Sequence, residues 1–140
     1  MMSKQSSSTL GALAAVLPLT IAAVQAASPE APAVAQAALA AVRAELQRPL
    51  ALRVQTLRVA GAWGFVIAEL RSPDDLPFDY TGTKLEEPAR EGYVSRQFAA
   101  LLARRAGTWE VLESRIGATD VAWADWAEKH HAPTALFALH

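Results

Sequence analysis

Apolar residues recur at helical spacing in one alanine-rich segment of the chain. A helix is expected over Ala33–Gln47, because alanine is the strongest helix former and Pro49 stops the helix. Its apolar stripe is narrow, so the helix needs a sheet to lie on, since an isolated helix of this length is only marginally stable in water. The positions of this stripe are Ala35, Leu39, Val42 and Leu46.

Four later segments have the apolar patterns of β-strands in two hairpins. In the first hairpin, one strand runs from Leu50 to Val59 and slips in phase near Leu57, which indicates a β-bulge. The return strand, Trp63–Leu70, is apolar on both faces, as a central strand is. Ala60-Gly61 forms the turn between these two strands.

The second hairpin repeats this pattern with strand Gln97–Arg104, turn Ala106-Gly107 and strand Trp109–Ile116. In both hairpins a tryptophan follows the glycine by two residues. Glycine accepts the positive φ of a tight turn, and the tryptophan covers the apolar face beneath the return strand. We therefore expect Trp109 to be buried, because Trp63 occupies the same position relative to its own turn.

The connection between the hairpins, Ser72–Gly92, contains three prolines and six acidic residues. Proline excludes a strand or a long helix from its first half, and Glu86–Glu91 can form one helical turn. A loop of this length in a small domain is either functional or partly disordered.

The last predicted element is a helix from Thr119 or Asp120 to about His131, which Pro133 ends. Its apolar face carries Trp123, Trp126, Ala127 and His130. The elements together predict an α+β fold. In this fold the Ala33–Gln47 helix lies across one face of a four-stranded antiparallel meander, and the short C-terminal helix closes an edge or end.

The first 26 residues have the pattern of a secretory signal peptide. Lys4 gives a positive start, and the apolar run Leu10–Ala23 has 14 residues, fewer than the roughly 20 that span a bilayer. Cleavage is expected after Val24-Gln25-Ala26, followed by a linker over 27–32 and a single domain over 33–140. The alternative is an uncleaved signal anchor, through which alone the protein would contact the membrane.

Composition adds mainly exclusions. The chain has 140 residues and no cysteine, which excludes disulfides, thiolate zinc sites and thiol nucleophiles. Its formal net charge of −1 does not provide the clustered Lys and Arg that neutralise phosphates, so no nucleic-acid partner is expected. A small exported domain without cysteine is typical of the bacterial periplasm or of a secreted protein.

The most conspicuous candidate chemistry is Asp120 with His130 or His131, since a carboxylate and an imidazole can form a general acid/base pair. Helix capping by the aspartate and the favourable helix dipole at the histidines explain the same residues without catalysis. Asp120 and His130 would also lie about 15 Å apart along one helix. The aspartates of the connection lack the ligand spacing of a calcium loop. No catalytic residue, metal or cofactor is therefore predicted.

The C-terminal run IGATDVAW, Ile116–Trp123, resembles the tail of a family of small exported bacterial proteins of unknown function. Other parts of the chain that fit this family are Arg58–Trp63, Asp79-Tyr80, Trp126, Ala132-Pro133 and Leu136-Phe137. The resemblance implies export but no particular activity. The order of helix, hairpin, long loop, hairpin and helix also resembles cystatin-like and nuclear-transport-factor-like α+β domains.

These observations favour a non-enzymatic binding or interaction module whose partner is a small molecule or an envelope protein. One alternative is a hydrolase-like enzyme that uses Asp120 with a nearby histidine, and another is an inhibitor or adaptor of a second envelope protein. Trp123 and Trp126 could form the wall of a ligand pocket or a partner groove, but two tryptophans at helical spacing are more often core residues. The candidate binding residues are Asp79, Tyr80, Thr119, Asp120, Trp123 and Trp126.

Overall fold

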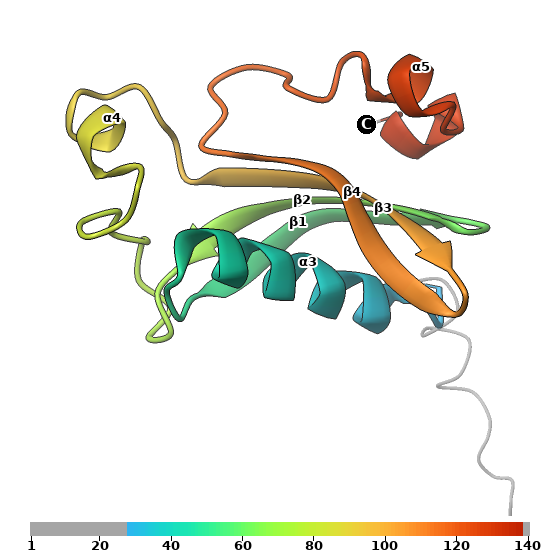
Figure 1. The fold of residues 1–140 in the computed structure, drawn as a ribbon, viewed down its shortest axis with the longest axis horizontal. Helices are drawn as coiled ribbons and strands as arrows, with labels where there is room; N and C mark the ends of the chain where they lie inside the picture. Colours follow the sequence, from blue (N-terminus) through green and yellow to red (C-terminus); the bar gives the residue numbers. More distant parts are fainter. Residues whose placement is uncertain (1–27, 139–140) are drawn as a thin grey trace, which may run out of the picture.

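A four-stranded sheet lies between two layers in the computed structural model, which describes residues 28–138 (Figure 1). Helix α3 (Ala31–Leu46) covers one face, and the C-terminal segment with the short helix α5 (Trp126–His130) covers the other. The signal peptide expected over residues 1–26 lies outside the described residues. Within 28–138, no helix has the length and apolar character needed to cross a membrane.

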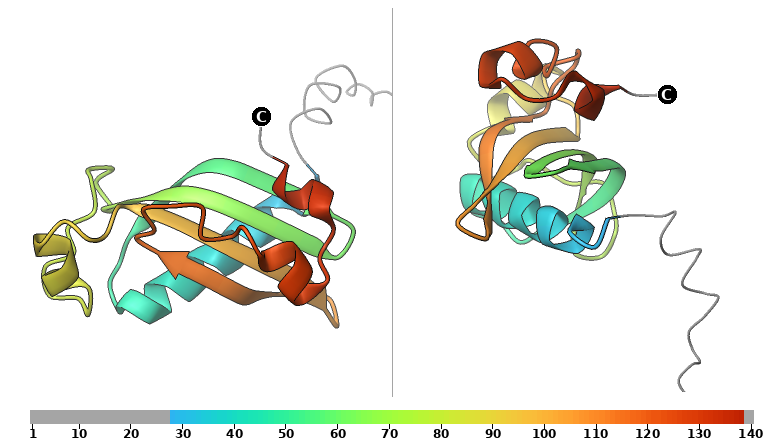
Figure 2. Two further views of the ribbon diagram at one scale, coloured as in Figure 1. Left: turned by 90° about the horizontal axis from the view of Figure 1, so that it is seen from above. Right: turned by 90° about the vertical axis from the view of Figure 1, so that its right-hand side faces the viewer.

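The sheet is an antiparallel meander with the strand order β1-β2-β3-β4. The connection after β2 lies beyond one end of the sheet and contains the predicted helical turn, α4 (Glu86–Arg90) (Figure 2). The predicted α+β fold, with a helix on a four-stranded meander and a short C-terminal helix, is therefore confirmed. The strands and the last 3-10 helix are β1 (Ala51–Ala60), β2 (Trp63–Arg71), β3 (Gln97–Arg105), β4 (Thr108–Ile116) and η2 (Thr134–Phe137).

Helix α3 packs on the sheet through a ladder of apolar residues spaced four apart. The helix begins at Ala31, two residues before the predicted start, and Pro32 lies in its first turn, where the missing N–H costs no hydrogen bond. Residues four apart lie on one line along a helix, so Val34 continues the buried line of Ala38 and Val42. Ala35, which was predicted on the buried face, is only half-buried. The buried residues of α3 are Val34, Ala38, Val42 and Leu46.

Both edge strands of the sheet contain a β-bulge. In β1 the register shifts between Val54 and Thr56, so Gln55 has no partner in β2. In β4 the shift leaves Leu112 unpaired opposite β3. Bulges increase local twist and interrupt the ladder, which hinders edge-to-edge association of sheets. The bulge predicted in the first strand is confirmed, two residues before Leu57.

The two hairpins use their glycines differently, so the two tryptophans do not occupy equivalent positions. The first loop is Gly61-Ala62, with positive φ only at the glycine, and Trp63 is the first residue after the loop. The second loop is Ala106-Gly107, with positive φ at both residues, and Trp109 is the second residue after the loop. A shift of one residue reverses the face of a strand. Trp109 is therefore buried in the core beneath α3, as expected, whereas Trp63 lies on the opposite face.

The C-terminal segment differs from its prediction in two ways. It packs on the second face of the sheet rather than at an edge or end, and its helix begins at Trp126 rather than at Thr119 or Asp120. The backbone before α5 makes separate turns, for example from Ala124 N to Val121 O at 3.2 Å, in place of continuous α-helical bonds. Among the described contacts the side chain of Asp120 accepts no backbone N–H, so this residue does not cap a helix.

Aromatic packing holds the C-terminal segment on this second face. The rings of Trp123 and Trp126 meet the ring of Phe65 edge-on, with centroids 5.7 Å and 6.3 Å away, and Phe137 meets it at 4.7 Å. Both tryptophans are buried, in agreement with the core interpretation. These contacts with β2 override the helical preference of the local sequence.

Candidate functional site

An open depression of about 710 Å³, here called the main hollow, lies on the second face of the sheet. Its floor comes from three strands, and its walls come from the residues just before β3 and just after β4. The volume falls within the roughly 300–1,000 Å³ typical of ligand pockets. The lining residues are Gln55, Glu69, Ser95, Arg96, Gln97, Ala118, Thr119, Asp120, Val121 and Trp123.

The main hollow exists because this face of the sheet changes from apolar to polar along β2 and β3. Ile67 and Ala99 are cross-strand partners in the apolar part, which the C-terminal segment covers. Two residues further along the same face, Glu69 pairs with Gln97, and both line the hollow. The bulge in β1 adds Gln55 to this floor, as bulges often redirect a side chain beside a site.

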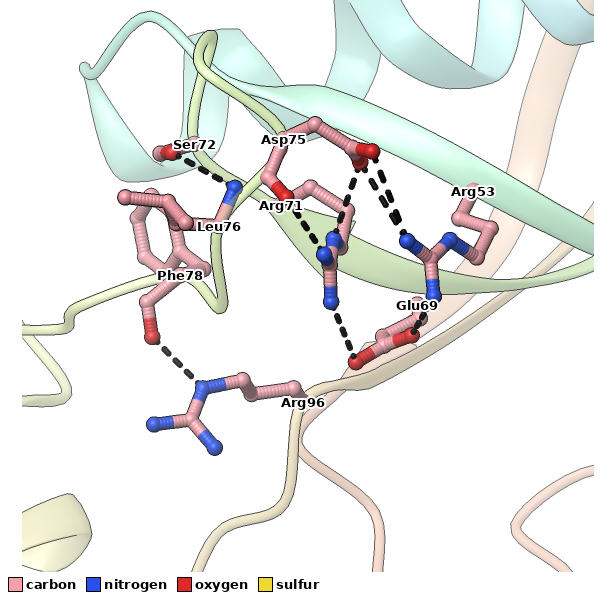
Figure 3. Close-up of polar contacts among 8 residues, drawn as sticks. All are labelled: Arg53, Glu69, Arg71, Ser72, Asp75, Leu76, Phe78 and Arg96. Carbon is pink, nitrogen blue, oxygen red and sulfur yellow. Dashed lines mark hydrogen bonds and ion pairs between the residues drawn. The ribbon is translucent and has the colours of Figure 1, made fainter.

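Glu69 is held between two arginines on the floor (Figure 3). Its Oε1 lies 3.5 Å from Arg53 Nη1, and its Oε2 lies 3.2 Å from Arg71 Nη1. Both arginines also contact Asp75 Oδ1, and the hydrogen bond from Arg71 is the main reason why the pKa of Asp75 is lowered. The charge of Glu69 is thus already compensated, so the carboxylate serves as a structural part of the floor.

Arg96 stands exposed at the end of the floor where the chain enters β3. Its Nε donates a 2.7 Å hydrogen bond to the carbonyl of Phe78, which fixes the guanidinium (Figure 3). Within residues 28–138, Nη1 and Nη2 of Arg96 have no hydrogen-bond or ion-pair partner. Arg96 therefore keeps a free pair of donors, and its charge acts on the connection, where it helps to lower the pKa of Asp79.

The wall that follows β4 is pinned to the start of β3. Gly117 N donates to Gln97 O at 2.7 Å, Ser95 N donates to Gly117 O at 3.0 Å, and the Ser95 hydroxyl donates to the carbonyl of Ala118. Gly117 has a φ of +82°, and a Cβ at this position would lie 2.8 Å from the Cβ of Val94. Both the positive φ and the lack of space for a Cβ require glycine at this position. The turn at Gly117 leads the chain to Ala118, Thr119 and Asp120, which line the main hollow.

The structure divides the six predicted binding residues among three places. Thr119, Asp120 and Trp123 line the main hollow together. Asp79 and Tyr80 line a smaller hollow of about 250 Å³ beside α4. Trp126 is 1% exposed in the core beneath the C-terminal segment, so its ring is not available to a ligand.

Asp79 and Tyr80 make structural contacts inside the connection. The Tyr80 hydroxyl donates to Ser95 O at 2.7 Å, and burial raises the pKa of this phenol to about 12. Asp79 Oδ1 accepts hydrogen bonds from the amide and the hydroxyl of Thr81, which lower the pKa of the carboxyl group. Arg96 lines this smaller hollow as well as the main one.

The histidines do not lie where the alternative, an acid/base pair with Asp120, would need them. Nε2 of His130 is 2.6 Å from Oε1 of Glu113, and Lys129 Nζ is 3.2 Å from the same carboxylate. The contact with His130 and then that with Lys129 lower the pKa of Glu113. No histidine lines the main hollow, and no hydrogen bond in the described part of the chain joins Asp120 to an imidazole. In that part, no three His, Cys, Asp or Glu side chains are grouped to hold a metal ion.

The sequence interpretation missed five polar residues of the main hollow: Gln55, Glu69, Ser95, Arg96 and Gln97. Two sequence signals could have indicated the three that lie on strands, Gln55, Glu69 and Gln97. The phase slip in the first strand marks a bulge, and a polar residue ends the apolar face of each central strand.

Comparison with known proteins adds no relative to this description. No protein-family model, curated protein or solved structure matches the chain. The fold and the site define an α+β protein with a hollow on one sheet face that polar side chains line.

Proposed function

We propose that the protein is a small exported binding module that holds a small polar molecule in the main hollow. The observation that carries this proposal is an open, ligand-sized hollow lined by polar groups without protein partners. Besides the free donors of Arg96, the side-chain amides of Gln55 and Gln97 make no hydrogen bond within the described residues. Such groups are hydrated in the free protein and can exchange water for a ligand.

The polar groups of the main hollow favour binding over catalysis. Glu69 is engaged by two arginines, and Asp120 has no imidazole partner among residues 28–138. General acid/base catalysis needs a group within hydrogen-bond reach of both its partner and its substrate. Recognition needs only fixed donors and acceptors of complementary chemistry.

Export is supported by the signal-peptide pattern of residues 1–26 and by the resemblance to small exported bacterial proteins. The full chain expressed in a bacterium should be recovered from the periplasm or the medium with the intact mass of residues 27–140. A full-length mass in the membrane fraction would contradict cleavage after Ala26.

Binding can be tested by amide chemical shifts of the ¹⁵N-labelled exported protein. Mixtures of amino acids, short peptides, sugars, carboxylic acids, polyamines and nucleosides would be titrated to millimolar concentration. We expect saturable changes at Gln55, Gln97 and Thr119–Val121 with at least one mixture. Gln97→Ala should weaken binding, whereas Gln47→Ala, on the opposite side of the sheet, should not. The proposal fails if no mixture produces saturable shifts in the hollow, or if all shifts lie elsewhere. The alternative in which the partner is an envelope protein would give such a result.

A further inference from the structure

We infer that the polar molecule proposed for the main hollow carries an apolar tail, which lies in a second hollow that meets the main one at Val121. This inference rests on the proposed function and names the class of its ligand, a small amphiphile with a neutral, hydrogen-bonding head. The second hollow, here called the apolar hollow, has a volume of about 290 Å³. Its lining residues are Val121, Trp123, Ala124, Ala127, Thr134 and Phe137.

Two residues connect the hollows, because Val121 and Trp123 line both of them. Both residues belong to the chain between β4 and α5, which runs along the second face of the sheet to α5 (Figure 2). The side chain of Val121 is 58% exposed, so the boundary between the hollows is open to solvent. A ligand whose head lies on the polar floor can therefore extend past Val121 into the apolar hollow.

The walls of the apolar hollow suit an uncharged, apolar group. None of its six lining residues is charged, and the small side chains of Ala124 and Ala127 leave space between the two rings and Val121. The rings of Trp123 and Phe137 both meet the ring of Phe65 edge-on, with centroids 5.7 Å and 4.7 Å away. Because the sheet holds these rings in place, little conformational entropy is lost when a ligand packs against them.

The size of the apolar hollow favours the tail of a small molecule over a protein partner. A stable protein interface uses about 20–30 residues on each side, many more than the six that line this hollow. Ligand pockets start at roughly 300 Å³, so the apolar hollow holds only part of a ligand. Of the large apolar side chains exposed in residues 28–138, only Val121 lines the main hollow. A tail that covers Val121 removes this apolar surface from water.

The charges of the main hollow favour a neutral head. Gln55 and Gln97 offer amide donors and acceptors, which complement amide or hydroxyl groups. The charge of Glu69 is compensated by its two arginines, and the Arg96 guanidinium points away from Glu69 toward the connection (Figure 3). Asp120 has no ion-pair partner within the described residues. An anionic head would therefore meet a negative charge without a compensating cation.

The first test uses two series of neutral probes, the N-acyl glycinamides and the alkyl β-glucosides, with tails of two, four, six and eight carbons. Each is titrated into the ¹⁵N-labelled exported protein below the concentration at which it forms micelles. The short members should shift only the amides of Gln97 and Thr119. The longer members should also shift Ala124, Ala127 and Phe137. In at least one series the affinity should rise by about twofold to fourfold for each CH₂ that the hollow buries.

Two variants test the path of the tail, and each has a matched control. Ala124→Asp places a charge in the apolar hollow and should remove the gain from the tail, while the short members bind as before. Ala135→Asp makes the same change at an exposed residue that lines neither hollow, and it should bind as the wild type does. Val121→Ser should reduce the gain, whereas Val54→Ser, at another exposed valine, should not.

A charged probe tests the head. N-octanoylglycine, which has a carboxylate in place of the terminal amide, should bind about twofold to threefold more weakly than N-octanoylglycinamide at low salt. This difference should shrink in Asp120→Asn. It should persist in Asp125→Asn, because Asp125 lies outside both hollows.

The inference is overturned if the affinity does not rise with tail length in either series, or if long tails shift the apolar hollow without Gln97 and Thr119. It is also overturned if Ala124→Asp and Ala135→Asp have equal effects, or if the anionic head binds more tightly than the amide. In each case the proposed function stands as long as a polar compound still gives saturable shifts in the main hollow. If neither the polar mixtures nor the amphiphiles shift the main hollow, the proposed function and the inference fail together.

Discussion

The indole Nε1 of Trp109 donates a 2.9 Å hydrogen bond to Oε1 of Glu30, across 79 positions of the chain. The other oxygen of Glu30 lies 2.6 Å from Arg104 Nη1, and this guanidinium lies over the Trp109 ring at 5.8 Å from its centroid. Glu30 directly precedes α3, so the contact fixes the start of that helix on the β3–β4 hairpin. The fold therefore starts only a few residues after the predicted cleavage position.

We predict that Trp109→Ala lowers the free energy of unfolding by about 3–5 kcal/mol. The ring is 8% exposed in the core beneath α3, and its loss leaves a cavity. Glu30→Gln keeps an acceptor for the indole and removes only the exposed ion pair with Arg104, so it should cost less than about 1 kcal/mol. Urea denaturation measures both values. A loss below about 1 kcal/mol for Trp109→Ala would place this residue outside the core.

The hairpins show how far the sequence alone determines the sheet. The repeated Gly-x-Trp pattern correctly predicts two hairpins, but it cannot specify the loop register. Glycine fits either the first or the second position of a two-residue hairpin loop, depending on the turn type. Gly61 is the first residue of its loop, and Gly107 is the second residue of its loop. Only the packing of the completed sheet decides which face Trp63 and Trp109 occupy.

The C-terminal segment and the main hollow depend on contacts that are distant in sequence. Helical spacing predicts one long helix, but contacts of Trp123 and Trp126 with Phe65 give a turn-rich segment and a short helix. Thr119 and Asp120 line the main hollow together because they are neighbours in the sequence. Their proximity to Arg96 requires the backbone pairing of β3 with the chain after β4, which no local pattern contains.

Because Asp120 does not cap a helix, we predict that both Asp120→Asn and Asp120→Ala change the free energy of unfolding by less than about 0.5 kcal/mol. The side chain is exposed and has no hydrogen-bond partner within the described residues. Denaturant melts of the two variants test this expectation. A loss of about 1 kcal/mol for alanine but not for asparagine would indicate capping in solution.

The contact of His130 with Glu113 should make stability depend on pH at the acidic end. The folded-state pKa of Glu113 lies below its ordinary value of 4.5, so this group stabilises the fold above pH 4.5. That stabilisation is lost as the pH falls through the lowered folded-state pKa. We therefore expect the difference in unfolding free energy between wild type and Glu113→Gln to decrease from pH 6 to pH 3.

Urea melts at several pH values measure this difference. Asp75 and Asp79 also have lowered pKa values, but they are present in both proteins and cancel in the comparison. A difference that stays constant over this range would mean that the carboxylate of Glu113 gains nothing from His130 and Lys129 in the folded state.

The last prediction concerns Gly117, which directs the wall of the main hollow. Gly117 and Gly92 have the same φ of +82°, but a Cβ at Gly92 meets nothing within 4 Å, whereas at Gly117 it would lie 2.8 Å from the Cβ of Val94. Gly92→Ala should cost about 1–2 kcal/mol from the left-handed backbone alone. Gly117→Ala should cost more, because the wall must also move away from Val94. Denaturant melts compare the stabilities, and the amide shifts of Thr119–Val121 should change only in Gly117→Ala. Equal losses, or unchanged shifts, would show that the contact with Val94 does not position this wall.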